Sequence, residues 1–196
     1  MEIGLVEGNI VDIHRKEIYF GRIEFGNTII TAIHRIGEVV SDAPYIAPGL
    51  IDSHVHIESS MLVPSSFSAL VIPCGTVGVV CDPHEIANVM GEEGVEFMIN
   101  DAKQSPLKFF FGVPSCVPAT AYESSGGVID SEGVERLFQI GAWFLSEMMN
   151  FPGVLSHDEA VMQKISIAKK YRKPIDGHAP GLVGDDLTRY IDAGIS

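Results

Sequence analysis

The chain has 196 residues, of which 46% are hydrophobic and 20% are charged, and its formal net charge is −13. A chain of this length can bury a substantial core, and this composition excludes a disordered tail. The excess of acidic residues argues against sequence-independent binding to nucleic acid or to an anionic membrane, because both require basic surface. We therefore expect a small-molecule partner.

The three cysteines indicate a reducing compartment. Cys74, Cys81 and Cys116 are odd in number, lie far apart and form no Cys-x-x-Cys motif. The sequence therefore suggests neither a disulfide framework nor a thiolate zinc site, and we expect buried thiols in a cytoplasmic protein. We expect no signal peptide and no membrane span, because the longest apolar run, residues 69–81, is short and contains proline and glycine.

The first 44 residues predict a small antiparallel β module. Gly-containing turns at Glu7-Gly8 and Gly26-Asn27 separate its short β-prone runs. These runs are residues 4–6, 10–13, 17–20 and 28–31. A linker at residues 37–44 follows, so we place a domain boundary between residues 44 and 45.

From residue 45 onward, strand-like runs alternate with helix-like runs, which is typical of βα units and a parallel sheet. The predicted strands are residues 46–53, 76–81, 108–113, 142–146 and 174–176. The predicted helices are residues 65–71, 92–104, 131–139, 156–171 and 185–194. We assign the N-cap of the first helix to Ser65 or Ser66, and that of the fourth helix to Ser156. The expected fold class is α/β, a partial (β/α) TIM-type barrel of about five βα units over residues 45–196.

Two histidines end the first predicted strand. His54 and His56 are two residues apart, so on a strand both imidazoles point to the same face and can bind one ion. Glu147 follows the fourth predicted strand and His178 follows the fifth. In a parallel barrel the carboxyl ends of the strands open on one catalytic face, and three imidazoles with a carboxylate suit Zn, Mn or Fe.

Each of these residues also has a simpler interpretation. An isolated His-x-His motif occurs by chance. Glu147 could cap a helix or pair with a basic residue, and His178 could hydrogen-bond within a turn. The loop at residues 114–127, rich in proline, serine and glycine, is either a recognition loop or a flexible connector.

Three more ionisable residues fall on the predicted catalytic face. Glu58 follows the two histidines, and His84 and Glu85 follow the second predicted strand. We name them as candidate catalytic residues, which would contact the substrate or support the metal ligands.

Several segments together resemble the motifs of a known family. Residues 48–56 resemble the first-strand signature of the amidohydrolase superfamily, whose members are metal-dependent hydrolases on a barrel with a small β domain. A narrower resemblance, to the adenine deaminases, covers nearly the whole chain from residue 48. The segments that carry it are residues 57–61, 82–89, 114–120, 146–154 and 176–180.

The resemblance implies a binuclear site for divalent Mn or Fe, with Zn as a third choice. His54 and His56 would bind one ion, Glu147 would bridge two ions and His178 would bind the second. The implied reaction is hydrolysis of the purine adenine to hypoxanthine and ammonia. The metal lowers the pKa of bound water, the resulting hydroxide attacks C6, and an acid protonates the leaving amine.

The resemblance also implies that this chain corresponds to the N-terminal part of a deaminase. Family members continue through strands six to eight, which supply a further metal-site histidine and an aspartate, and then through a C-terminal domain. We therefore expect very little activity from this chain alone.

Two other functions stay open at this stage. One is a cyclic-amide hydrolase of the same superfamily, although such enzymes usually carry lysine at the position of Glu147. The other is a non-catalytic, metal-binding half barrel that needs a partner chain. Because unpaired strand edges favour association, we also expect a homo-oligomer.

Overall fold

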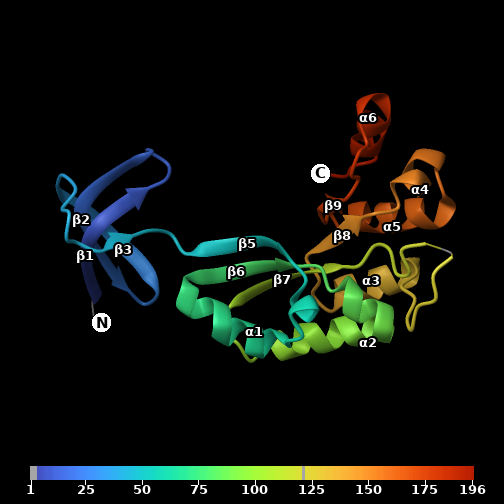
Figure 1. The fold of residues 1–196 in the computed structure, drawn as a ribbon, viewed down its shortest axis with the longest axis horizontal. Helices are drawn as coiled ribbons and strands as arrows, with labels where there is room; N and C mark the ends of the chain where they lie inside the picture. Colours follow the sequence, from blue (N-terminus) through green and yellow to red (C-terminus); the bar gives the residue numbers. More distant parts are fainter. Residues whose placement is uncertain (1–3, 121) are drawn as a thin grey trace. The chain divides into compact units, whose positions relative to one another are not determined.

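The computed structural model describes residues 4–120 and 122–196 and consists of two compact units. The units are Met1–Gly49 and Leu50–Ser196. The first contains a four-stranded sheet and the second a five-stranded sheet (Figure 1). The division falls after Gly49 rather than after Pro44, because the short strand β4, Tyr45–Ile46, pairs with β1 of the first unit.

The first unit is a mainly antiparallel sheet with the strand order β3-β2-β1-β4. Its longer strands are β1 Gly4–Asp12, β2 Glu17–Gly26 and β3 Ile29–Gly37. The predicted turn at Glu7-Gly8 is wrong, because β1 continues through both residues and pairs with β2 along its whole length. Gly8 instead permits a close approach of the backbone, since a Cβ there would lie 2.5 Å from the carbonyl oxygen of Pro44.

The second unit is a parallel half barrel in which strands that follow one another in sequence are neighbours in the sheet. Its strands are β5 Leu50–Val55, β6 Thr76–Cys81, β7 Lys108–Val113, β8 Phe144–Met148 and β9 Ile175–Gly177. Its α-helices are α1 Pro64–Val71, α2 His84–Ala102, α3 Ser131–Gln139, α4 Phe151–Ser156, α5 Glu159–Lys170 and α6 Gly184–Asp192. Two 3₁₀ turns are η1 Ile57–Ser60 and η2 Ile72–Cys74. This arrangement confirms the predicted α/β partial barrel.

Two strand predictions differ from the structure. The first predicted barrel strand, residues 46–53, is divided between β4 and β5, because Pro48 and Gly49 interrupt the run between the two sheets. Glu147 lies within β8 rather than after it.

The starts of the first two helices also differ from prediction. Pro64 occupies the first turn of α1 and Val63 is its N-cap, so Ser65 and Ser66 are not caps. Proline is favoured there because the first helical N–H groups have no partner within the helix. The helix predicted to begin at residue 92 begins at His84 as α2, which bends at Gly91, where φ is 62°. Because the helix bends there, the apolar residues before and after Gly91 do not follow one continuous helical period. The sequence pattern therefore predicts only the part of α2 that follows the bend.

The predicted fourth helix consists of two helices. Ser156 ends α4, and the carboxylate of Asp158 caps α5 by accepting a hydrogen bond from the backbone N–H of Val161 at 3.0 Å. The predicted N-cap at Ser156 is therefore wrong. His157 has a φ of 56°, a left-handed conformation that ends α4 and separates the two helices.

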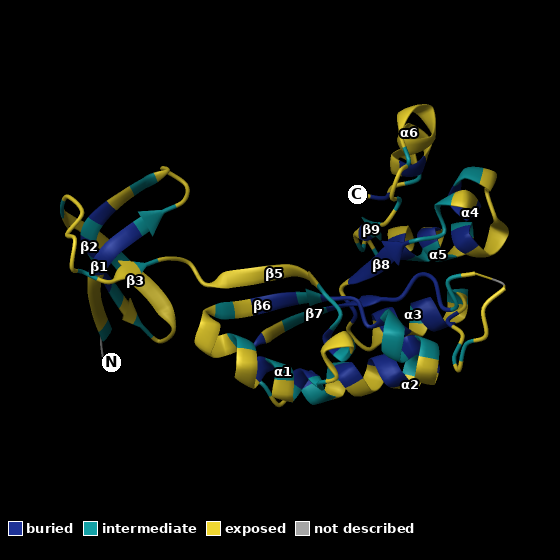
Figure 2. Ribbon diagram, in the orientation of Figure 1, coloured by how far each residue is buried: buried dark blue, intermediate teal, exposed yellow. Residues whose placement is uncertain are grey.

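The core of the second unit lies between the sheet and its helices. Strands β6, β7 and β8 are largely buried, whereas the edge strand β5 is exposed (Figure 2). Of the three free cysteines, Cys81 and Cys116 are buried as predicted, but Cys74 is exposed because it lies in η2 at the surface. Within the described residues, no helix has the length and apolar character needed to cross a membrane.

Candidate metal centre

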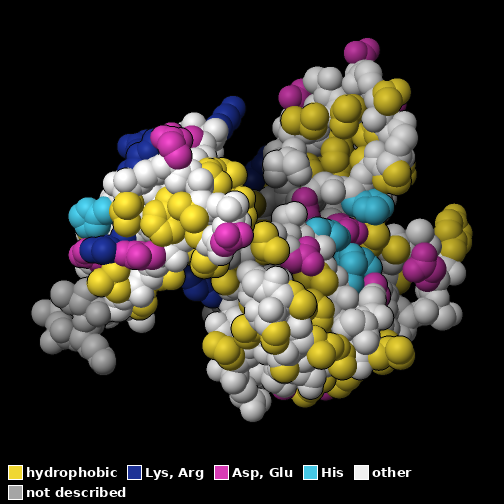
Figure 3. Space-filling view, turned by 60° about the vertical axis from the view of Figure 1, so that its left-hand side comes forward, with side chains coloured by type: hydrophobic (Ala, Val, Ile, Leu, Met, Phe, Trp, Pro, Cys, Tyr) yellow, Lys and Arg dark blue, Asp and Glu magenta, His cyan; other side chains and the backbone are white. Residues whose placement is uncertain are grey.

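The polar ends of three strands of the half barrel define the candidate site. His54 lies near the end of β5 and His56 follows that strand, Glu147 lies in β8, and His178 follows β9. Parallel strands place such residues at one edge of the sheet. Histidine and acidic side chains gather at one place on the surface of the second unit (Figure 3).

Glu147 is the centre of this cluster. Its side chain is almost fully buried, and its Oε1 lies 2.5 Å from Nε2 of His54 and 3.6 Å from Nε2 of His56. Its other oxygen, Oε2, lies 3.4 Å from Nδ1 of His178. All four predicted ligand residues are therefore brought together around one carboxylate, from positions up to 124 residues apart in the sequence. Their role as ligands stays a prediction.

The geometry of the two strand histidines fits a metal ion. Their Nε2 atoms face each other at 3.0 Å, and the ligand atoms of His54, His56 and Glu147 lie within 4.8 Å of one another. Two nitrogen ligands each about 2.1 Å from a tetrahedral ion would lie about 3.4 Å apart. Nδ1 of His56 is 2.8 Å from the carbonyl oxygen of Asp82. That bond places the proton on Nδ1 and leaves the Nε2 lone pair free for an ion.

His84 lies beside this group at the start of α2. Its Nδ1 is 3.0 Å from Oδ2 of Asp82, and its ring centroid is 4.6 Å from that of His56. The hydrogen bond to Asp82 raises the pKa of His84 to about 9. Asp82 is 2% exposed and its Oδ1 has no hydrogen-bond partner among the described residues. A raised pKa favours the protonated form of His84, so its ring pairs with the buried carboxylate of Asp82 beside His56.

Glu58 and Glu85 differ in how they hold a proton. Burial raises the pKa of Glu58 above its ordinary value. Burial also favours the neutral form of Glu85, but the hydrogen bond from the Ser59 hydroxyl, 2.7 Å away, and the nearby histidines outweigh it and lower its pKa. Oε2 of Glu85 lies 3.4 Å from Nδ1 of His56, whereas Glu58 accepts a hydrogen bond from the backbone N–H of Ile86 at the start of α2. Two carboxyl groups with opposed pKa shifts are suited to acid and base roles.

Sequence reasoning missed three residues that shape the site. Asp82 could have been found, because it is a charged residue directly after a buried apolar strand. Ser59 and Tyr190 carry no local signal, since each reaches the site only through the tertiary fold. Tyr190 donates a hydrogen bond to the carbonyl of Met148 and accepts one from the backbone N–H of His178.

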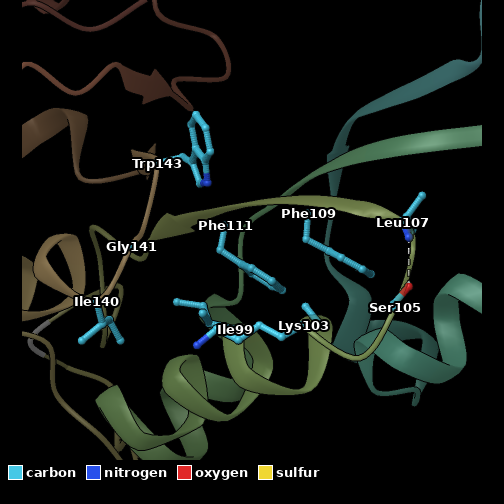
Figure 4. A pocket seen from close by; sticks show the side chains of 10 residues that line it. Ile99, Lys103, Ser105, Leu107, Phe109, Phe111, Ile140, Gly141 and Trp143 are labelled. Carbon is cyan, nitrogen blue, oxygen red and sulfur yellow. Dashed lines mark hydrogen bonds between the residues drawn. The ribbon is translucent and has the colours of Figure 1, made fainter. Parts of the chain in front are cut away.

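A separate cavity of about 390 Å³ lies at the opposite ends of the strands. Phe109 and Phe111 of β7 stack on each other there and extend toward α2, and Trp143 precedes β8 (Figure 4). The described residues that line it include neither histidine nor a carboxylate. It is therefore not the candidate metal site.

A comparison with protein families shows the class to which the chain belongs. The sequence model of the amidohydrolase family matches residues 45–196, and the chain belongs to this family. The family implies a divalent metal ion, and the histidines and carboxylates described above are candidate ligands.

Curated relatives give a narrower likeness. The chain is 54% identical to the adenine deaminase of Methanosarcina barkeri over 191 residues, which are 97% of this chain and 34% of that protein. It is 50% identical to the adenine deaminase of Methanothermobacter thermautotrophicus over 193 residues, which are 98% of this chain and 36% of that protein. The chain thus spans about a third of the length of these relatives. The resemblance stated from the sequence motifs is confirmed.

Solved structures share the fold. N-isopropylammelide isopropylaminohydrolase from Burkholderia multivorans matches with a TM-score of 0.62 at 14% identity, over 98% of this chain and 56% of that one. A 5-methylcytosine deaminase from Klebsiella pneumoniae matches with a TM-score of 0.58 at 12% identity, over 97% of this chain and 55% of that one. At such low identity these likenesses show the fold alone.

Proposed function

We propose that this chain provides the metal-binding half of a hydrolase that converts adenine to hypoxanthine and ammonia. The observation that carries the proposal is the convergence of three imidazoles on the buried carboxylate of Glu147. The adenine deaminases that match nearly the whole chain support adenine as the substrate.

In this proposal the four ligand residues hold two divalent ions. His54 and His56 would bind one ion, His178 would bind the other, and the carboxylate of Glu147 would be shared between them. Imidazole and carboxylate donors together suit Mn or Fe, with Zn as a third choice. When bound, such ions supply Lewis acidity that activates a water molecule near neutral pH.

The remaining ionisable groups would handle protons and orient the purine. Glu58, with its raised pKa, is suited to hold a proton on its carboxyl group and deliver it to the leaving amine. Glu85, with its lowered pKa, is suited to accept a hydrogen bond from a purine N–H. His84, protonated by its contact with Asp82, is suited to donate to a ring nitrogen.

The setting of this chemistry is also part of the proposal. The free thiols of the described chain support a reducing cytoplasm, where purine metabolism would use the reaction. The exposed apolar residues of the edge strand β5, among them Leu50 and Ile51, support association with further strands or with other copies.

Metal content tests the proposal directly. We expect purified protein to retain divalent metal, and we expect His54→Ala and His178→Ala to lose much of it, because each removes one imidazole ligand. Elemental analysis by mass spectrometry after gel filtration gives the ratio of metal to protein. His14→Ala is the matched control, since His14 lies in an exposed turn of the first unit and should not change the metal content. Equal metal in all four proteins would refute the site.

A further inference from the structure

Tyr190 connects the two strands that carry Glu147 and His178. It lies in α6 and is 3% exposed. Its hydroxyl donates a hydrogen bond to the carbonyl oxygen of Met148 at 2.6 Å and accepts one from the backbone N–H of His178 at 3.0 Å. The two backbone groups belong to the residue after Glu147 and to His178 itself, so one hydroxyl links the chain at both ligand positions.

The sheet alone holds these strands loosely at this point. β8 and β9 pair at Leu145 with Ile175 and at Met148 with Gly177, and the register shifts between the two pairs. Glu147 lies within that irregular stretch. A register shift of this kind interrupts the regular ladder, so backbone pairing constrains the position of Glu147 less than it would in a regular strand.

The ring of Tyr190 is itself held in place by packing. Gly177 lies directly under it, since a Cβ at residue 177 would be 3.3 Å from Cε1 of Tyr190. Beyond α6 the chain returns to the sheet, where the backbone N–H of Ser196 donates to the carbonyl of Ile175 at 3.0 Å. Ile195 is buried in the same core cluster as Tyr190. The packing of the buried ring therefore fixes the position of the Tyr190 hydroxyl.

We propose that Tyr190 is a positioning residue that sets the separation of Glu147 and His178 and thereby the affinity of the second ion. This inference rests on the metal pair of the proposed function. Both hydrogen bonds of its hydroxyl go to backbone groups, so Tyr190 acts through the backbone on both sides of the 3.4 Å contact between Nδ1 of His178 and Oε2 of Glu147.

Tyr190→Phe is the sharpest test, because it keeps the buried ring and removes only the hydroxyl. Loss of a hydrogen bond that orients a metal ligand typically costs about 10- to 100-fold in metal affinity. We expect the second equivalent of Co²⁺ to bind more weakly by about this factor. We expect the first equivalent to change much less, because His54 lies on β5 and His56 directly after it, and among the described residues Tyr190 makes no hydrogen bond to that strand end.

The experiment is titration of metal-depleted protein with Co²⁺, followed by calorimetry and by visible absorption. Tyr171→Phe is the matched control, since its hydroxyl donates to Glu135 at 2.9 Å on the helical side of the unit. A second readout needs no metal. The amide proton of His178 should exchange with solvent faster in Tyr190→Phe than in wild type, and at an unchanged rate in Tyr171→Phe.

The possible outcomes separate this inference from the proposed function. Wild type that binds no Co²⁺ refutes the metal pair, and with it the inference. Two equivalents bound equally well by wild type and Tyr190→Phe overturn the role of Tyr190 and leave the metal pair intact. Equal weakening of both equivalents, shared by Tyr171→Phe, also overturns it, because general loss of stability then explains the result. Selective weakening of the second equivalent with faster exchange at His178 supports it.

Discussion

The pairing of His84 with Asp82 predicts how the stability of the metal-free protein depends on pH. The buried carboxylate raises the pKa of His84 to about 9 from an ordinary value near 6.5. The folded state therefore binds this proton more tightly than the unfolded chain does. The contribution of the pair to stability is fully present below about pH 6.5 and is lost as the pH rises through about 9.

The size of this effect follows from the pKa difference. One pKa unit corresponds to about 1.36 kcal/mol, so a pKa raised from 6.5 to about 9 corresponds to at most about 3.4 kcal/mol. Water reaches the rim of this site, and screening reduces the expected value to about 1 to 2 kcal/mol. In Asp82→Asn the hydrogen bond to a charged partner, which is the largest cause of the shift, is gone. Burial, which lowers the pKa of His84, then opposes the weaker attraction of Glu85 and Glu147, so this pKa should fall toward its ordinary value. The stability difference between wild type and variant should then be larger at pH 6 than at pH 9.5 by about 1 to 2 kcal/mol.

The assay is urea unfolding at pH 6, 7.5 and 9.5 in the presence of a chelator, with the slope m compared to confirm that the same surface is exposed. An NMR titration of the His84 ring gives its pKa directly. His34→Gln is the control, because His34 lies 3.5 Å from Glu24 at an exposed position of the first unit. Its effect on stability should depend little on pH. A pH-independent difference between wild type and Asp82→Asn, or an NMR pKa near 6.5 in wild type, would refute this reasoning.

Two further predictions concern activity and helix capping. Hypoxanthine release from adenine should be very slow for this chain alone and should rise when a co-expressed chain supplies strands six to eight. Glu147→Gln should abolish the restored activity. Turnover by the chain alone at about ten per second would contradict this expectation. Asp158→Ala should lower the free energy of unfolding by about 1 kcal/mol through loss of the N-cap of α5, whereas Ser156→Ala should change it by much less. Thermal unfolding of both variants decides between the two candidate caps. A larger loss of stability in Ser156→Ala than in Asp158→Ala would favour Ser156 as the N-cap.

The sequence by itself determined the βα order and the fold class, and it predicted four residues that the structure brings together in the candidate site. β6 and α3 have the predicted bounds, because each is a short segment with one clear pattern, apolar and β-branched in Thr76–Cys81 and amphipathic in Ser131–Gln139. His54 and His56 were recognisable as a pair because a strand places alternate residues on one face. Glu147 and His178 were predicted as their partners because each was placed at the end of a predicted strand, on the same face.

Only the tertiary structure decided the helix boundaries, the distances within the site and the contacts of Tyr190. The start of α2 was missed because the bend at Gly91 breaks the helical period, and Ser156 was mistaken for a cap because Asp158, two residues on, satisfies the same requirement. The distances around Glu147 depend on the curvature of five strands, which no single segment encodes. Tyr190 shows the limit most clearly. Its hydroxyl reaches the backbone of His178 and Met148 only because α6 folds back over β9, a contact set by packing across the sheet and not by sequence spacing.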